Sequence, residues 1–486
     1  MGMNIIIQFA YIPILLHYLT KNEYGLYQLI GSLIAYMAVM DFGLSTTIVR
    51  YYSKYKALRD KKGEENILAI FSIIYGIITI VCILIGGVLY SFIESIYGNT
   101  LNVAELNSAK TMFLILLGNV AITIPSNIFA AVIIAHERFI FLRLVAILQT
   151  CLKPLAVISV FAYEANAINL AIINTFFNFF VITCNIYYCY KKLNFKAKFY
   201  YWDKLLVKEV LVFSFFIFLN VIVDQLYWKT SQLVLGAVSG TVAVAVYAVA
   251  VQLDMAFMSF STGISGVFLP KLSAIVATTK NMIAVDELFI RIGRIQYLIL
   301  AFICSGFLIY GKQFIFLWIG DGFEEAYYIA SLLMVALLVP LIQSLGVSIL
   351  QAMNKHAFRS KLYTLIAIFN FVISIPLAKQ YGGIGCAIAT SGAFFLGGWI
   401  IINIYYYKII HLDILKFFKE ILNLTIPLLI VAFFALLGEH FITETSISIL
   451  VGKIMVYIAF YGIIMWKFGM NKYEKGLIVG LFHGRI

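Results

Sequence analysis

Fourteen long apolar stretches divide this sequence, and the short connections between them alternate between basic and acidic or neutral composition. A helix needs about 20 apolar residues to cross the hydrocarbon core of a bilayer. Lys and Arg collect in cytoplasmic connections because they resist translocation across the membrane. The pattern therefore predicts an all-α polytopic membrane protein with fourteen transmembrane helices, and it excludes a soluble fold.

The predicted spans follow the apolar stretches in order. They are 3–19, 24–49, 66–92, 110–135, 139–163, 167–189, 207–236, 241–269, 290–311, 326–352, 358–379, 383–407, 418–437 and 447–466. The first stretch begins almost at residue 1, so helix 1 is short or the true N-terminus lies upstream. An even number of spans is expected to place both chain ends on the cytoplasmic side.

Charged residues in the connections set the predicted orientation. The connections after the second and sixth spans are basic, through Arg50, Lys54, Lys56, Arg59, Lys61, Lys62, Lys191, Lys192, Lys196, Lys198, Lys204 and Lys208. Those after the third, ninth and thirteenth spans are acidic, through Glu94, Glu105, Asp321, Glu324, Glu325, Glu439 and Glu444. We therefore expect a multi-pass protein of the bacterial cytoplasmic (inner) membrane, with cytoplasmic N- and C-termini.

Composition restricts the functional classes. Hydrophobic residues make up 63% of the chain and charged residues 12%, and the mean hydropathy is +0.98. The net charge of +12 is concentrated in the connections that we place in the cytoplasm, where it suits an anionic lipid surface rather than nucleic acid. We find no enzyme motif, metal-ligand spacing or cofactor fingerprint, so we expect neither an enzyme nor a cofactor.

A weak internal repeat predicts the domain organisation. Residues 24–53 match residues 244–273 without gaps, including the pairs Tyr27 with Tyr247 and Gly43 with Gly263. Repeats of six helices share one orientation and are related by an axis along the membrane normal. We therefore expect two six-helix lobes around a central cleft, with an appended helix pair. The predicted parts are an N-lobe at 1–190, a basic linker at 191–206, a C-lobe at 207–408, and helices 13–14 with a cytoplasmic tail at 409–486.

Four stretches resemble a known family. They are EYGLYQLIGSLIAYMAVMDFGLSTTIVRYYSKY at 23–55, QLVLGAVSGTVAVAVYAVAVQL at 232–253, VFLPKLS at 267–273 and ISIPLAKQYGGIGCAIAT at 373–390. They are similar to the polysaccharide and oligosaccharide flippases, including O-antigen repeat-unit flippases, of the superfamily shared with multidrug extruders and the lipid II flippase. The chain departs from the family pattern at Gln232, where an acidic or Asn residue is expected.

The resemblance implies a cargo and partners. Members of this family move undecaprenyl-diphosphate-linked sugars from the cytoplasmic to the periplasmic leaflet by alternating access of two lobes. The implied partners are the lipid-linked oligosaccharide, membrane lipids and, in surface polysaccharide assembly (O-antigen or capsule), a glycan polymerase and ligase. The alternative is a cation-coupled multidrug extruder of the same superfamily. The lysines within the membrane spans favour the flippase.

Five charged residues lie within predicted spans, where a charge is costly and usually faces a cavity or a partner: Asp41, Lys153, Asp224, Lys229 and Asp254. Lys153 follows Gln149 by one helical turn, so both side chains project from one face. Lys153 is the candidate cation for a diphosphate. An internal ion pair and a snorkelling lysine are the alternatives.

The seventh predicted span carries two adjoining polar stripes. One is formed by Asn220, Asp224, Trp228 and Ser231, and the other by Gln225, Lys229 and Gln232. A lipid-facing helix does not tolerate so wide a polar surface, so we expect this helix to line the cleft. Lys229 is then a second diphosphate contact, and Trp228 a platform for a sugar ring. Charge neutralisation by neighbouring helices and an interfacial position for the tryptophan are the alternatives.

Three further charged residues each have two alternative roles. Arg50, at the cytoplasmic end of the second span, either captures the diphosphate first or serves only as a positive-inside residue. Asp41 and Asp254 either bind a proton or sodium ion and couple ion flow to transport, or pair structurally with lysines. A groove for the polyprenyl tail at the appended helix pair is a further expectation from the resemblance to the lipid II flippase.

Overall fold

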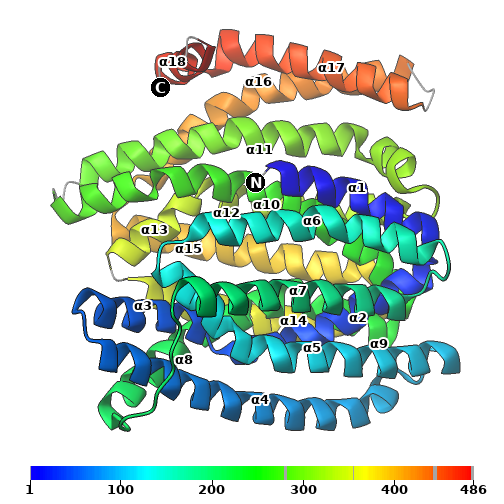
Figure 1. Cartoon of the computed structure of the whole chain (residues 1–486). Helices are drawn as coiled ribbons and strands as arrows, with labels where there is room; N and C mark the ends of the chain where they lie inside the picture. The colour runs from blue at the N-terminus through cyan, green and yellow to red at the C-terminus, as the bar shows by residue number, and fades with distance from the viewer. Residues whose placement is uncertain (1, 279–281, 354, 442–445, 483–486) are drawn as a thin grey trace. The chain divides into compact units, whose positions relative to one another are not determined.

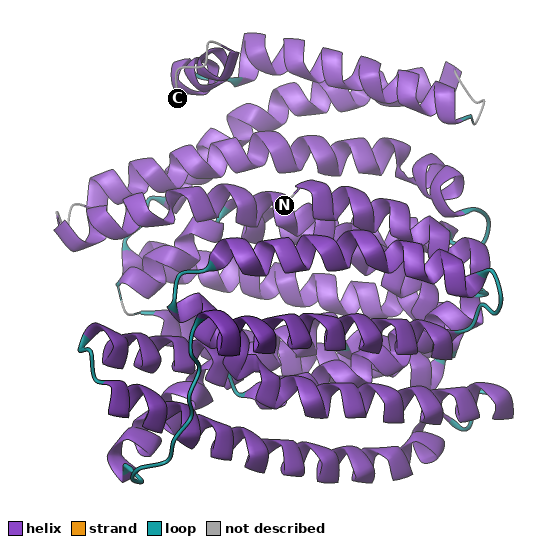
Figure 2. Cartoon of the chain, viewed as in Figure 1, coloured by secondary structure: helices purple, strands orange, loops and turns teal. Residues whose placement is uncertain are grey.

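The computed structural model describes residues 2–278, 282–353, 355–441 and 446–482 of the chain. These residues are almost entirely helical, and no strand occurs among them (Figure 2). Most connections are short. The extended segment 193–203 between α7 and α8 is the clear exception.

The helices, labelled as in Figure 1, follow one another along the chain. They are α1 (Gly2–Tyr18), α2 (Lys21–Ala38), α3 (Leu44–Ala57), α4 (Lys61–Tyr97), α5 (Val103–Ala135), α6 (Phe139–Phe161), α7 (Ala167–Lys192), α8 (Lys204–Trp228), α9 (Thr230–Val238), α10 (Thr241–Thr278), α11 (Met282–Ile319), α12 (Glu324–Ile342), α13 (Ser344–Ala352), α14 (His356–Phe394), α15 (Ile402–Tyr405), α16 (Ile414–Phe441), α17 (Ile447–Ile464) and α18 (Lys472–Phe482). A short 3-10 turn, Val39–Asp41, joins α2 to α3, and π-helical turns flank α15.

Eleven helical segments in the described part of the chain are long and apolar enough to cross a membrane. One of them, Ala357–Ile410, contains two antiparallel helices. Its backbone leaves the helical conformation at Gly382 (φ 56°, ψ −131°), and the Asn370 side chain bonds to Thr390 at 3.3 Å. Residues 20 positions apart in a straight helix would be about 30 Å apart, so the chain reverses here. The count of fourteen spans stays a prediction.

Three predicted spans are wrong as continuous helices, because each is interrupted. The span at 24–49 breaks at Phe42 and Gly43, whose φ angles of 51° and 68° lie in the left-handed region. A Cβ on Gly43 would lie 2.3 Å from the side chain of Ile217, so neighbouring atoms also require glycine there. The spans at 207–236 and 326–352 are divided at Lys229 and Gln343, single residues that separate α8 from α9 and α12 from α13.

The chain forms two compact units, Met1–Ala245 and Val246–Ile486. Helices α8 and α9 belong to the first unit by their contacts, although the sequence assigns this segment to the C-lobe. The predicted six-helix lobes and the cleft between them stay predictions.

In the first unit, α5 lies at the centre and packs against α2, α3, α4 and α7 (Figure 1). Large apolar side chains are completely buried around it, including Phe71 and Phe113. Close helix contact is also achieved through small residues: a Cβ on Gly25 of α2 would lie 1.9 Å from the carbonyl oxygen of Thr241. In lipid, such van der Waals packing is a main source of helix association.

In the second unit, α11 is the central helix and packs against α12, α16 and α17. Phe289 of α11 and Phe417 of α16 are buried against each other, with ring centroids 4.9 Å apart. The predicted cytoplasmic tail contains a helix, α18, which follows the last long apolar segment after a short turn (Figure 1).

Candidate functional site

Asp41 lies in the first unit at the break between α2 and α3, surrounded by neutral donors. Tyr75 Oη and Asn127 Nδ2 donate to Asp41 Oδ1 at 3.0 and 2.9 Å, and Ser45 Oγ donates to both carboxylate oxygens at 3.2 Å. Among the described residues, no lysine or arginine lies within 4 Å of this carboxylate. The charge is therefore stabilised by hydrogen bonds from three helices, α3, α4 and α5, rather than by an ion pair.

Lys153 lies in the middle of α6, with its Nζ atom 5.6 Å from the centre of the Tyr11 ring of α1. Within the described part of the chain it has no carboxylate at ion-pair distance. Lys153 is partly exposed, whereas the Tyr11 hydroxyl is buried and has no hydrogen-bond partner there. The structure thus places a cation on an aromatic face, an arrangement that leaves its N–H groups available.

Asparagine side chains of α5 and α7 meet in the first unit. Asn178 Nδ2 donates to Asn119 Oδ1 at 2.5 Å and to Thr123 Oγ1 at 2.6 Å. One turn earlier on α7, Asn174 donates to the hydroxyl of Tyr27 on α2. Tyr27 is close enough to Tyr11 for an electrostatic interaction. We call Asn119, Thr123, Asn174 and Asn178 the amide row.

The junction between α8 and α9 packs against α2. Tyr36 Oη donates to the Gln225 carbonyl oxygen at 3.2 Å and shares a 2.6 Å hydrogen bond with Thr230. Ser32 donates to the side chain of Gln232, and both residues are buried. The Gln232 side chain therefore bonds within the protein interior, which accounts for a polar residue at this position.

The other predicted site residues are dispersed. Lys229 lies at the α8–α9 junction and is partly exposed, and Gln149 lies one turn before Lys153. Arg50 is exposed and stacks 4.8 Å from the Phe213 ring of α8. Asp224 is exposed and Trp228 partly exposed, and the side chain of Asn220 lies outside the described residues.

In the second unit, the Asp254 side chain of α10 is fully buried. Both carboxylate oxygens are without a hydrogen-bond partner among the described residues, and no lysine there lies at ion-pair distance. Cys304 of α11 is an electrostatic neighbour. A buried unpaired carboxylate is costly, which fits a group that changes its protonation or its partner during a functional cycle.

A buried ion cluster in the second unit was not predicted. Arg294 of α11 donates through Nε and Nη2 to Glu474 of α18 at 2.6 and 3.0 Å, and through Nη1 to the Glu420 side chain of α16 at 2.7 Å. Carbonyl oxygens of Glu420 and Gly469 accept the two remaining N–H groups at 3.0 and 3.1 Å. All five guanidinium donors are therefore satisfied by the protein.

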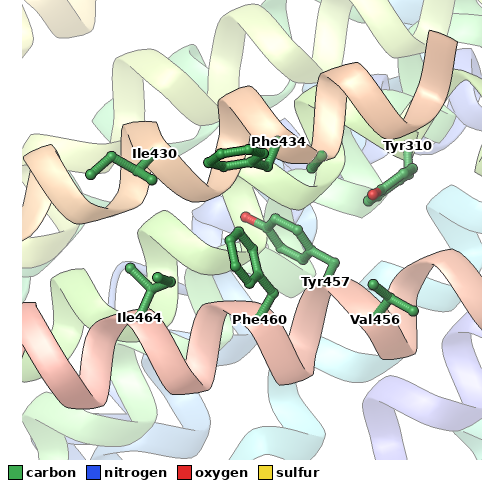
Figure 3. A pocket seen from close by; sticks show the side chains of 8 residues that line it. Tyr310, Ile430, Phe434, Val456, Tyr457, Phe460 and Ile464 are labelled. Carbon is green, nitrogen blue, oxygen red and sulfur yellow. The ribbon is translucent and has the colours of Figure 1, made fainter.

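An apolar groove of about 530 Å³ lies between α16 and α17 (Figure 3). Its lining side chains point toward one another from both helices, with Tyr310 of α11 at one end. They are Tyr310, Ile430, Phe434, Ala435, Val456, Tyr457, Phe460 and Ile464. This groove lies on the predicted appended helix pair and is suited to a hydrocarbon chain.

The sequence matches a family model described as "Polysaccharide biosynthesis protein" over residues 1–276, more than half of its length. The chain belongs to this family. The matched region contains the Asp41 cluster, Lys153 and the amide row. A comparison with curated proteins finds no match.

Solved structures share the fold of this chain. The structure titled "Lipid II flippase MurJ, inward closed conformation" aligns with a TM-score of 0.71 at 17% identity, covering 96% of this chain and 98% of that one. An inward-facing multidrug resistance MATE family transporter of the MOP superfamily aligns at 0.66 and 14%, covering 84% and 96%. A MOP superfamily transporter from Pyrococcus furiosus aligns at 0.51 and 14%, covering 83% and 96%. At these low sequence identities, the structural similarity establishes only the fold of this chain.

The sequence contained signals for some site residues that were not singled out. Asn119, Thr123 and Asn127 recur every four residues, and Asn174 and Asn178 are also four apart, which places each set on one helix face. A polar stripe along an apolar span predicts an interior face. The hydrogen-bond partners themselves, such as Tyr75 for Asp41, come from other helices and have no local signal.

Proposed function

We propose that this protein is a flippase that moves undecaprenyl-diphosphate-linked oligosaccharide repeat units from the cytoplasmic to the periplasmic leaflet by alternating access. It would serve the assembly of a surface polysaccharide such as O-antigen or capsule, together with a glycan polymerase and ligase. Family membership and a fold shared with a lipid II flippase support a lipid-linked cargo.

The proposal depends mainly on the position and surroundings of Lys153. A charge within a membrane span is expensive and usually serves a substrate or ion path. This lysine contacts an aromatic ring instead of a carboxylate, so no ion pair among the described residues neutralises it and its ammonium group is available to an anionic ligand. A diphosphate next to polar sugars requires a cation of this kind.

The remaining predicted residues take roles in the same proposal. Lys229 and Gln149 provide further polar contacts to the headgroup, Arg50 captures the diphosphate at the membrane surface, and Trp228 stacks on a sugar ring. The apolar groove between α16 and α17 accommodates the polyprenyl tail. Asp41 and Asp254 are the proposed ion-coupling carboxylates.

The test is deletion of the gene followed by complementation. The wild-type chain restores surface glycan, whereas Lys153→Ala and Lys229→Ala are expected to restore far less at equal membrane abundance. Lys191→Ala is the matched control, because Lys191 is an exposed lysine at the end of α7 that contacts Tyr187. Full restoration of glycan by both interior variants would refute the cationic path.

The second candidate is a cation-coupled multidrug extruder, favoured by the unpaired carboxylate of Asp254 and by the MATE-like fold. A cationic drug would be attracted to carboxylates and repelled by Lys153. The same deletion strain separates the two: loss of drug tolerance with intact surface glycan supports the extruder, and the opposite result supports the flippase.

A further inference from the structure

The amide row is a cluster of polar side chains in the first unit that was not predicted from the sequence. The exposed residues of α7 form an apolar stripe that includes Ile172 and Phe176. Asn174 and Asn178 lie on a different face, bonded to α2 and α5. The row therefore faces the interior of the unit rather than the surrounding lipid.

The row has unused hydrogen-bonding capacity. Asn178 commits both of its N–H groups to Asn119 and Thr123, so its Oδ1 atom is free. The Oδ1 atom of Asn174 and the Nδ2 group of Asn119 likewise lack partners in the described part of the chain. All three residues are partly exposed. One donor group and two acceptors thus point to a ligand that both donates and accepts hydrogen bonds.

The chemistry of that ligand follows from charge and position. The row is neutral, so it provides no positive charge for a bare phosphate and no negative charge for a cationic drug. Sugar hydroxyl and acetamido groups both donate and accept, which is what free amide groups require. Asn174 of the row bonds to Tyr27, and Tyr27 is an electrostatic neighbour of Tyr11, whose ring lies 5.6 Å from Lys153 Nζ. The cation suits the diphosphate of a lipid-linked sugar, and the neutral polar row suits the sugar that follows it.

We propose that the amide row binds the sugar residue attached directly to the diphosphate, while Lys153 binds the diphosphate itself. This inference rests on the proposed flippase function and adds to it a sugar subsite in the first unit. Asn174 and Asn178 are one helical turn, about 5.4 Å, apart, so the subsite holds a single ring. Recognition at the amide row then depends on the first sugar, and recognition at Lys153 on the lipid diphosphate.

The test compares two probes on the purified full chain: undecaprenyl diphosphate, and undecaprenyl diphosphate carrying one N-acetylglucosamine. Binding is measured by native mass spectrometry in detergent. We expect the wild type to bind the sugar-bearing lipid at least tenfold more tightly than the bare lipid. Asn178→Leu and Asn119→Leu should bring this ratio close to one without changing the affinity for the bare lipid.

Two controls make the result decisive. Asn185→Leu removes another α7 amide, on the same helix but outside the row, and should keep the wild-type ratio. Lys153→Gln should weaken both probes equally. If Asn178→Leu does not fold, as judged by thermal unfolding, Asn119→Leu alone carries the test.

The possible failures are distinguishable. Equal binding of the two probes by the wild type, or an unchanged ratio in the folded amide variants, overturns the sugar subsite but leaves the flippase proposal intact. Failure of the wild type to bind either probe overturns the flippase proposal itself.

Discussion

Replacing Arg294 with methionine should release α18 from the second unit. The side chains of Arg294 and Glu474 are only 5% and 2% exposed, and their two hydrogen bonds are 2.6 and 3.0 Å long. Removing one partner of a buried ion pair costs about 3–5 kcal/mol, because the other charge remains buried without compensation. Glu474 avoids this cost by moving into water, which moves α18 with it, or by taking up a proton.

Hydrogen exchange of the α18 amides measures this release. Since about 1.4 kcal/mol corresponds to a factor of ten, the expected loss of protection is roughly a hundredfold to a few thousandfold. Amides of α12, which lie outside the cluster, should keep their exchange rates. Arg291→Met is the matched control: Arg291 stacks 4.3 Å from the Tyr473 ring of α18, and such a contact is worth only about 0.5–1 kcal/mol.

A double variant tests the cause. Combining Arg294→Met with Glu474→Leu removes both buried charges and leaves an apolar contact, which is often neutral or stabilising. Protection of α18 should then return to within about tenfold of the wild type. Unchanged exchange in the single variant would refute the argument that the ion cluster holds α18. A double variant as unprotected as the single one would refute the role of uncompensated charge.

Three shorter predictions concern the first unit. Asp41→Asn removes the charge that accepts three side-chain donors, worth about 1.5–3 kcal/mol per charged hydrogen bond, and should lower the thermal unfolding midpoint and glycan export together. Gly25→Ala places a Cβ against the Thr241 carbonyl and should destabilise the protein by about 1–3 kcal/mol in thermal unfolding, whereas a neutral result would mean that the helices separate easily. Asn66→Leu removes three hydrogen bonds to the backbone of Tyr200 and Tyr201, each worth about 1 kcal/mol, and should expose segment 193–203 to protease; equal cleavage of wild type and variant would contradict this.

The apolar stretches predicted most helices correctly because hydrophobic length is a local property. Segments such as Lys61–Tyr97 and Val103–Ala135 extend beyond their predicted spans but contain them. The reversal at Gly382 was also predictable, since the sequence placed a glycine-rich turn between two spans there. A membrane-spanning segment must satisfy its own backbone hydrogen bonds, so apolar length alone specifies a helix.

The candidate site was only partly predictable. Lys153 and Asp41 stand out as charges within apolar spans, and the four-residue spacing of asparagines on α5 is visible in the sequence. The neutral partners of Asp41 and the aromatic partner of Lys153 come from other helices. Arg294 lies near the start of the predicted span 290–311. Nothing in the sequence indicates that two glutamates from distant helices pair with it.

The two copies of the internal repeat show that similar sequences do not determine where a helix breaks. Gly43 and Gly263 occupy matching positions, yet the helix breaks at Gly43 and α10 continues through Gly263. Glycine permits both outcomes because it pays no steric penalty for positive φ. At Gly43 the close approach of Ile217 from α8 favours a residue without a side chain. The sequence alone determined the membrane class, the helical character and the charged residues within spans. The tertiary structure decided which helices break and which polar groups meet, because both depend on neighbours far away along the chain.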